Sequence, residues 1–256
     1  MSTFTPTTGG PAALVNILNR IKADFDGAVL TAGAAGLTSM TRSAKPVKRM
    51  HQHVGDLVVA ERIPQSWVGL EQSIATRFGD KRQDVVVIPR GRTKPTGETT
   101  LSIGVKSAMR GIQKNKDNHF SGIRAEMFNL HETFPNIVCG HVLIIAVKEW
   151  DTAAAQGREI AYKRLSPNTL AEMIQRYGRV SGRKTGESIG DAERLALILA
   201  DFSTTPVTHY KTVADLERDG FLHADSGLTL TGLDIDTFAA DLIGEHRSRH
   251  TGANRL

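Results

Sequence analysis

The longest apolar run in this sequence, residues 137–147 (IVCGHVLIIAV), limits the possible folds more than any other feature. It is too short to cross a bilayer and is typical of a β-strand that is buried on both faces. A second run of this kind, residues 85–88 (VVVI), lies upstream. Since such strands need helices on both sides of their sheet, we expect an α/β fold with a central mixed β-sheet flanked by helices.

The segment between these two runs adds a third strand. Residues 101–108 (LSIGVKSA) alternate, so their apolar side chains share one face of a strand and Lys106 lies on the other. Residues 89–100 are rich in proline, glycine and basic side chains, which predicts a hairpin connection. We therefore expect strands near residues 84–88, 101–107 and 138–147.

Apolar residues at helical spacing predict the helices that would cover this sheet. The predicted helices span residues 11–26, 64–78 and 168–177, and a further helix runs from a cap at Asp117 or Asn118 to an end before Pro135. The polar, basic residues 110–118 are then expected to form a connector. Residues 191–202 fit either a helix or a strand.

We expect one catalytic domain over residues 1–256, with a possible small C-terminal subdomain at residues 190–256. Within that segment, a predicted helix is followed by two short strands around Asp225-Ser226-Gly227. This order resembles the helix and wing of a winged helix. A plain helix–hairpin element that packs on the sheet is an equal alternative.

Composition permits nucleic acid as a partner. The chain has a net charge of +5, and its basic residues gather in segments expected to be loops or helix ends, where they can reach a phosphate backbone. The single cysteine, Cys139, lies within an apolar run and cannot form an internal disulfide. The N-terminal residues lack the pattern of an export signal. We expect a cytoplasmic protein that does not bind membranes.

Charged side chains within apolar patterns point to a metal site. Asp84 opens the run at residues 85–88, and Glu126 and Glu71 fall on the apolar stripes of predicted helices. A carboxylate in such a place is costly unless it is paired or binds a cation. For Glu71 we keep both readings open, namely pairing with Arg77 or another nearby base, and a supplementary acid at a metal site.

These side chains suit hydrolysis of a phosphodiester. The reaction needs a divalent cation, carboxylates that hold it, and a group that orients the attacking water. Mg²⁺ prefers oxygen ligands and keeps several waters, so that two or three carboxylates suffice. We expect Asp84 and Glu126 to bind Mg²⁺, while Lys106 orients the water or balances the phosphate charge.

The order of Asp84 and Lys106 on successive strands resembles the PD-(D/E)XK nuclease superfamily, and more narrowly the type II restriction endonucleases. The sequence departs from that pattern at Gln83, where the family usually has proline. It departs again at Gly104, where the family has Asp or Glu. The resemblance implies Mg²⁺-dependent, sequence-specific cleavage of double-stranded DNA.

A subgroup of restriction enzymes takes the second acid from the helix that follows the lysine. That helix carries an Arg-Ala/Ser-Glu element followed by Asn-Leu, and Arg124-Ala125-Glu126 and Asn129-Leu130 are similar to it. The resemblance implies that Glu126 replaces the acid missing at Gly104, whose lack of a side chain leaves room for that carboxylate.

Basic and amide side chains in two segments are candidates for DNA contacts. The candidates are Arg110, Gln113, Lys114 and Asn115 in the connector, and Arg183 and Lys184 in the loop at residues 178–188. That loop does not match a phosphate-binding loop. A restriction enzyme of this kind is by default a two-fold homodimer that reads a palindrome.

His51 and His53 form an H-x-H pair that can bind zinc from a strand, but without an evident third ligand we expect them to face DNA or the surface.

Two other functions remain as alternatives to the restriction enzyme. A non-catalytic winged-helix regulator would bind DNA without cutting it. A structure-specific DNA-repair nuclease would cut by DNA shape.

Overall fold

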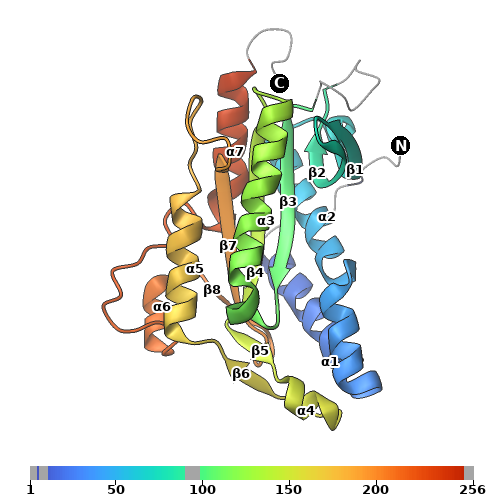
Figure 1. The fold of residues 1–256 in the computed structure, drawn as a ribbon, viewed down its shortest axis with the longest axis vertical. Coiled ribbons are helices and arrows are strands. Elements are labelled where there is room, and N and C mark those ends of the chain that lie inside the picture. Colours follow the sequence, from blue (N-terminus) through green and yellow to red (C-terminus); the bar gives the residue numbers. More distant parts are fainter. Residues whose placement is uncertain (1–4, 6–10, 90–98, 251–256) are drawn as a thin grey trace.

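A six-stranded mixed sheet forms the centre of the computed structural model, which describes residues 5, 11–89 and 99–250 (Figure 1). The strands follow the order β1 (Val68–Thr76), β2 (Gly79–Val87), β3 (Leu101–Ala108), β4 (Val138–Ala146), β7 (Arg194–Asp201) and β8 (Thr208–Tyr210). The pairs β1–β2, β2–β3 and β7–β8 are antiparallel, whereas β3, β4 and β7 run parallel. The predicted α/β fold is confirmed.

Helices cover both faces of the sheet, as its apolar strands require. On one face lie α3 (Ile112–Thr133) and α5 (Pro167–Arg179), and on the other α2 (Lys45–Ala60) and α7 (Ile235–Arg249) (Figure 1). The long α1 (Pro11–Arg42) packs on α2. Smaller elements are η1 (Gln65–Trp67), β5 (Lys148–Trp150), α4 (Thr152–Gln156), β6 (Tyr162–Arg164) and α6 (Val213–Arg218). Every residue of β4 is buried, because helices lie on both of its faces.

The helix predicted over residues 64–78 is wrong. These residues form η1 and then β1, which pairs with β2 along its length. Gly79, with φ 108°, makes the tight turn between the two strands. Apolar residues three and four positions apart also occur in strands, and here pairing with β2 overrides the helical spacing. Ile74 is buried, whereas Phe78 is 62% exposed.

The predicted connector at residues 110–118 is also wrong, because α3 starts at Ile112. Gly111 adopts the left-handed conformation, with φ 61°, just before the helix. The backbone N–H of Ile112, which has no partner within the helix, donates to Glu149 Oε1 at 2.6 Å. The N-terminal helix is longer than predicted, because α1 continues past residue 26; it is kinked at Gly33 (φ 59°, ψ −140°) and then runs to Arg42.

The C-terminal segment belongs to the same sheet. Residues 191–202 contain strand β7, and β7 and β8 extend the sheet from β4. Helix α7 packs on β7 and β4. Residues 221–234 contain no strand, so the predicted wing around Asp225 is not formed. Strands β7 and β8 of this segment are therefore part of the central sheet.

None of the helices in the described parts of the chain is both long and apolar enough to span a bilayer.

The predicted hairpin segment at residues 90–98 lies outside the described residues, but β2 and β3 on either side of it are antiparallel neighbours. The three strands predicted near residues 84–88, 101–107 and 138–147 are confirmed as β2, β3 and β4.

Candidate active site

Asp84 lies where two strands of the sheet separate. Strand β2 pairs with β3 only through residues 85–87, and the next residue toward the start of β2 is Asp84. Its Oδ2 atom accepts a hydrogen bond from the backbone N–H of Val105 at 2.7 Å. Asp84 therefore does not open its strand, since β2 begins at Gly79. This hydrogen bond fixes the carboxylate against the backbone of β3, one residue before Lys106.

Helix α3 brings Glu126 to Lys106, with 3.3 Å between Oε2 and Nζ. Glu126 is only 6% exposed, whereas the lysine side chain is 41% exposed at the surface of the site. Burial would raise the pKa of Glu126, but His141 and Lys106 hold that pKa below its usual value. Glu126 is thus a buried carboxylate that stays ionised at neutral pH.

His141 fills the space above Gly104. The two residues are direct neighbours on β4 and β3, and a Cβ atom at position 104 would lie 2.1 Å from Cε1 of the imidazole. The ring is fully buried, and its Nε2 lies 3.8 Å from Glu126 Oε2. Burial lowers the pKa of His141 although the charge of Glu126 raises it, so the ring is neutral. Only glycine fits beside this ring.

Glu71 lies opposite Asp84, on strand β1. The flanking residues of the two strands are paired, but Glu71 has a φ of 52°, in the left-handed region that non-glycine residues rarely adopt. Its carboxylate contacts Arg82 and lies 3.3 Å from Lys48 Nζ. Burial would raise the pKa of Glu71, but Lys48, Arg82 and His51 lower it. Glu71 therefore pairs with bases other than Arg77, which lies near Glu132.

His51 connects the two carboxylates on the β1–β2 hairpin. It lies on helix α2 and is 4% exposed, with Nδ1 3.4 Å from Glu71 Oε1 and Nε2 3.4 Å from Asp84 Oδ1. Burial lowers the pKa of His51, while the charges of Asp84 and Glu71 raise it. The expectation that His51 and His53 face DNA or the surface is wrong, because α2 buries both of them.

These residues form one site. Asp84, Gly104 and His141 lie side by side on three adjacent strands, and the charges of Asp84, Glu126 and Lys106 all act on the imidazole of His141. The site draws side chains from α2 and α3, which cover opposite faces of the sheet (Figure 1). Of the predicted catalytic residues, Asp84, Lys106, Glu126 and Glu71 are all present, and His51 and His141 are added.

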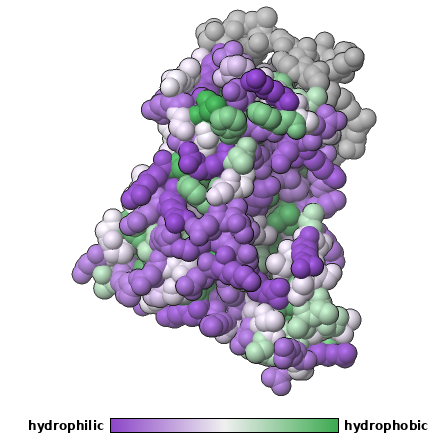
Figure 2. Space-filling model, in the orientation of Figure 1, coloured by the Kyte–Doolittle hydropathy of each residue, from purple (hydrophilic) through white to green (hydrophobic). Residues whose placement is uncertain are grey.

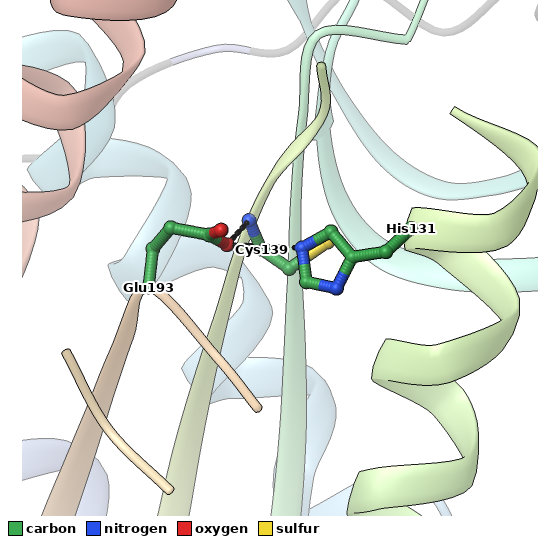
Figure 3. A group of neighbouring side chains, drawn as sticks. All are labelled: His131, Cys139 and Glu193. Atoms are coloured by element: carbon green, nitrogen blue, oxygen red, sulfur yellow. Dashed lines mark hydrogen bonds and ion pairs between the residues drawn. The ribbon is translucent and has the colours of Figure 1, made fainter. Parts of the chain in front are cut away.

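Among the described residues, one group of His, Cys and acidic side chains has its possible metal-ligand atoms within 4.8 Å of one another: His131, Cys139 and Glu193, deep in the fold (Figure 3). The Glu193 carboxylate already accepts from the Cys139 N–H at 2.7 Å and lies 3.2 Å from His131 Nε2. Its other oxygen lies 2.6 Å from Arg183 and 2.8 Å from Arg249. Two guanidinium groups and two N–H donors satisfy this carboxylate, and their positive charge opposes a cation.

The group around Glu193 instead connects several elements. His131 belongs to α3, Cys139 to β4 and Arg249 to α7, and Nδ1 of His131 lies 2.9 Å from the carbonyl oxygen of Ile189. Burial would raise the pKa of Glu193, but the hydrogen bond with His131 and the surrounding charges lower it to about 2. This is an ion-pair cluster that fixes α3 against the sheet.

The predicted DNA-binding residues have different surroundings. Arg110, Lys114 and Asn115 line a cleft of about 780 Å³ at the start of α3. Its other charged lining residues are Arg42, Lys163, Glu149 and Asp151, so that basic side chains outnumber acidic ones. The surface on the side of α3 and α5 is largely hydrophilic (Figure 2). Gln113 and Lys184 are exposed. Arg183 is buried against Glu193, so it is removed from the candidates for DNA contacts.

In comparisons with known proteins, no family model, curated protein or solved structure matches this chain.

Proposed function

We propose that this chain is a type II restriction endonuclease, which hydrolyses phosphodiester bonds of double-stranded DNA with the help of Mg²⁺. The observation that carries the proposal is the contact of Lys106 with the buried, ionised Glu126, beside an Asp84 carboxylate fixed by a backbone N–H. Two carboxylates and one lysine are the groups that metal-dependent phosphodiester hydrolysis needs.

The donor set suits a divalent cation. Glu126 is an anion in a nearly water-free position, and a negative charge there is stabilised when a cation binds. We propose that Asp84 and Glu126 hold the ion. When bound, the ion polarises the phosphate and lowers the pKa of a coordinated water.

The residues of the chain have separate tasks in this proposal. Lys106 is the more exposed partner of Glu126, so its ammonium can turn toward the scissile phosphate and orient the attacking water. The N–H of Val105 keeps Asp84 in place, and His51 supports the same carboxylate from α2. Glu71 acts through His51, because Lys48 and Arg82 already neutralise its charge.

DNA would lie along the basic cleft at the start of α3. Arg42, Arg110, Lys114 and Lys163 line it and can contact phosphates, and Gln113 and Asn115 have the amide groups suited to base edges. Two copies related by a two-fold axis would place two such clefts on a palindrome. We propose a homodimer that acts in the cytoplasm.

Phage DNA incubated with the full chain and Mg²⁺ tests the proposal. Discrete fragments that vanish with EDTA are expected. A smear indicates a nuclease that reads structure rather than sequence. A gel shift without cleavage, unaffected by metal, indicates a DNA-binding regulator and overturns the proposal. The variant Glu126→Gln, which keeps the size of the side chain, excludes a contaminating nuclease if it is inactive.

A further inference from the structure

Two aromatic rings lie together at the surface, outside the buried core. Among the described residues, the large apolar side chains that are exposed are those of Leu30, Phe78 and Phe128. The two phenylalanines form an aromatic pair, since their ring centroids are 6.3 Å apart and the ring planes are tilted by 37°. Single exposed apolar side chains are common, whereas apolar groups that gather at the surface mark sites where a partner binds.

The aromatic pair is held on a rigid support. Phe78 lies in the turn between β1 and β2, whereas Phe128 lies on α3. The backbone N–H of Arg77, just before Phe78, donates to Thr133 Oγ1 at the end of α3, at 2.9 Å. Because the turn is tied to the helix, the rings keep their place without a partner, and binding one costs little conformational entropy.

The pair lies next to the proposed catalytic centre. Phe128 follows the buried Glu126 by about half a turn of α3, and the charge of Lys81, on β2, acts on the Glu126 carboxylate. Lys114, in the cleft at the start of α3, lies about four helical turns before Phe128, so the two project from nearly the same side of the helix, roughly 20 Å apart. That distance is the length of about six base pairs, so a duplex that lies in the cleft can also reach the pair.

The charged groups around the pair suit a nucleic acid. The exposed cations next to the two rings along the chain are Arg77, Lys81 and Arg124. The acidic side chains beside them are Asp80, Glu132 and Asp191. Arg77 lies 3.4 Å from one of these carboxylates and Arg124 lies 3.5 Å from another. Ion pairs at the surface are weak, so either guanidinium can turn to a phosphate.

The size of the pair favours a base over a protein as its partner. A phenylalanine side chain buries about 200 Å², so the exposed parts of the two rings amount to roughly 200 Å² in total. A standard protein interface needs about 800 Å² from each chain, whereas single bases can cover rings of this size. A second copy of the chain, docked here on a two-fold axis, would also bring the same cations face to face.

We infer that Phe78 and Phe128 form a wedge that stacks on bases of the bound DNA, next to the phosphate at which cleavage is proposed. The inference rests on the proposed function and deepens it, because it assigns a contact with bases beyond the cleft. In a duplex, a ring reaches the face of a base only by entering between two base pairs, which unstacks and kinks the DNA. A mismatched pair lowers the cost of unstacking, so the wedge favours such a step.

Tryptophan fluorescence tests the inference without relying on cleavage. Phe78→Trp places an indole in the pair, and stacking on a base quenches indole fluorescence. We expect a mixed-sequence duplex, added to the full chain in EDTA, to quench this added signal, measured as the difference from the wild-type chain. The matched control is Leu30→Trp, because Leu30 is an exposed apolar residue on α1, outside the proposed DNA path. Its added signal should stay unquenched.

Alanine variants measure how much the rings contribute. Because both rings are exposed, their removal leaves the buried core intact. We expect Phe78→Ala and Phe128→Ala each to weaken DNA binding about tenfold by fluorescence anisotropy, with an unchanged salt slope, and Phe78→Tyr to keep the wild-type affinity. Lys81→Gln should instead reduce the slope by about 0.9. The wild type should also prefer a duplex with one mismatched pair, and Phe78→Ala should lose that preference.

The outcomes separate this inference from the proposed function. Alanine variants that bind DNA as the wild type does, with no quenching in Phe78→Trp, overturn the wedge, and the nuclease stands if the chain cleaves phage DNA. Alanine variants that change sedimentation but not DNA affinity show a contact between copies of the chain, which also overturns the wedge. Quenching and weakened binding, in a chain that does not cleave DNA, support the wedge and overturn the nuclease. A chain that binds no DNA overturns both.

Discussion

Nε2 of His51 lies 3.4 Å from Oδ1 of Asp84. The other ring nitrogen lies at the same distance from Glu71, a residue whose φ of 52° costs roughly 1–3 kcal/mol. Such strain persists only where the surrounding contacts determine the conformation, and here Lys48 and Arg82 hold the Glu71 carboxylate. Glu71, His51 and Asp84 therefore form a chain of contacts that ends at the proposed metal ligand.

Two substitutions of His51 separate the two ends of this chain. The amide nitrogen of glutamine reaches about as far as Nε2 and can meet Asp84, whereas that of asparagine matches Nδ1 and can meet Glu71. We expect His51→Asn to lower the single-turnover cleavage rate by about 10–100-fold, and His51→Gln to lower it less. DNA affinity, measured by fluorescence anisotropy, should stay the same in both. Equal losses in the two variants would show that the contact with Asp84 is unimportant.

Glu126→Gln removes the proposed ligand charge but keeps the side-chain volume. We expect cleavage to fall by on the order of 10³-fold, which corresponds to several kcal/mol of transition-state stabilisation. DNA binding without metal should persist. The matched control is Glu132→Gln on the same helix, because Glu132 pairs with Arg77, whose side chain is exposed. If Glu126→Gln cuts DNA at the wild-type rate, the proposed centre is wrong.

If DNA lies in the cleft at the start of α3, substituting the cations that line it should change how DNA affinity depends on salt concentration. Lys114 is exposed there and Arg110 is half-buried beside Thr152, so neutral glutamine at either position removes one phosphate contact. We expect each substitution to reduce the slope of log affinity against log salt by about 0.9. Lys211→Gln is the control, since Lys211 pairs with Asp236. Unchanged slopes for Arg110→Gln and Lys114→Gln would place the DNA elsewhere.

The sequence could predict the fold where a pattern was compatible with only one kind of secondary structure. The alternation in residues 101–108 and the buried run at residues 137–147 each indicated a strand, and both are strands. Residues 64–78 have apolar side chains at helical spacing, which predicts a helix, but they form β1 because they pair with β2, a contact that the local sequence does not contain. The helix start at Ile112 depends on a carboxylate from a distant segment.

The residues of the candidate site also fall into those that the sequence could predict and those that it could not. Asp84, Lys106 and Glu126 stood out because charged residues interrupt apolar patterns, which is a local signal. His141 sits inside an apolar run, and its nearness to Glu126 follows from the register that pairs it with Gly104. No spacing in the sequence gives that register. His51 belongs to helix α2, which was not predicted from the sequence, and its burial follows from the packing of that helix on the sheet.

Acidic pH should weaken the Glu193 ion-pair cluster that holds helix α3 against the sheet. The pKa of Glu193 is about 2, below the usual 4.5, so its ionised form stabilises the folded state above pH 4.5. That stability, about 3 kcal/mol, is lost as the pH falls from 4.5 toward 2. Glu193→Gln leaves Arg183 and Arg249 without their shared carboxylate, and we expect it to cost about 3–5 kcal/mol at pH 7.

Urea unfolding of the wild type and Glu193→Gln at pH 7 and pH 3 measures this effect. The difference in free energy of unfolding between the two should narrow at pH 3, because the wild-type carboxylate is then losing its advantage over the unfolded state. Glu187→Gln, on the exposed loop before β7, should change stability by less than about 0.5 kcal/mol at either pH. A difference between wild type and Glu193→Gln that is the same at both pH values would mean that the Glu193 charge does not stabilise the cluster. The link between α3 and the sheet would then rest on packing alone.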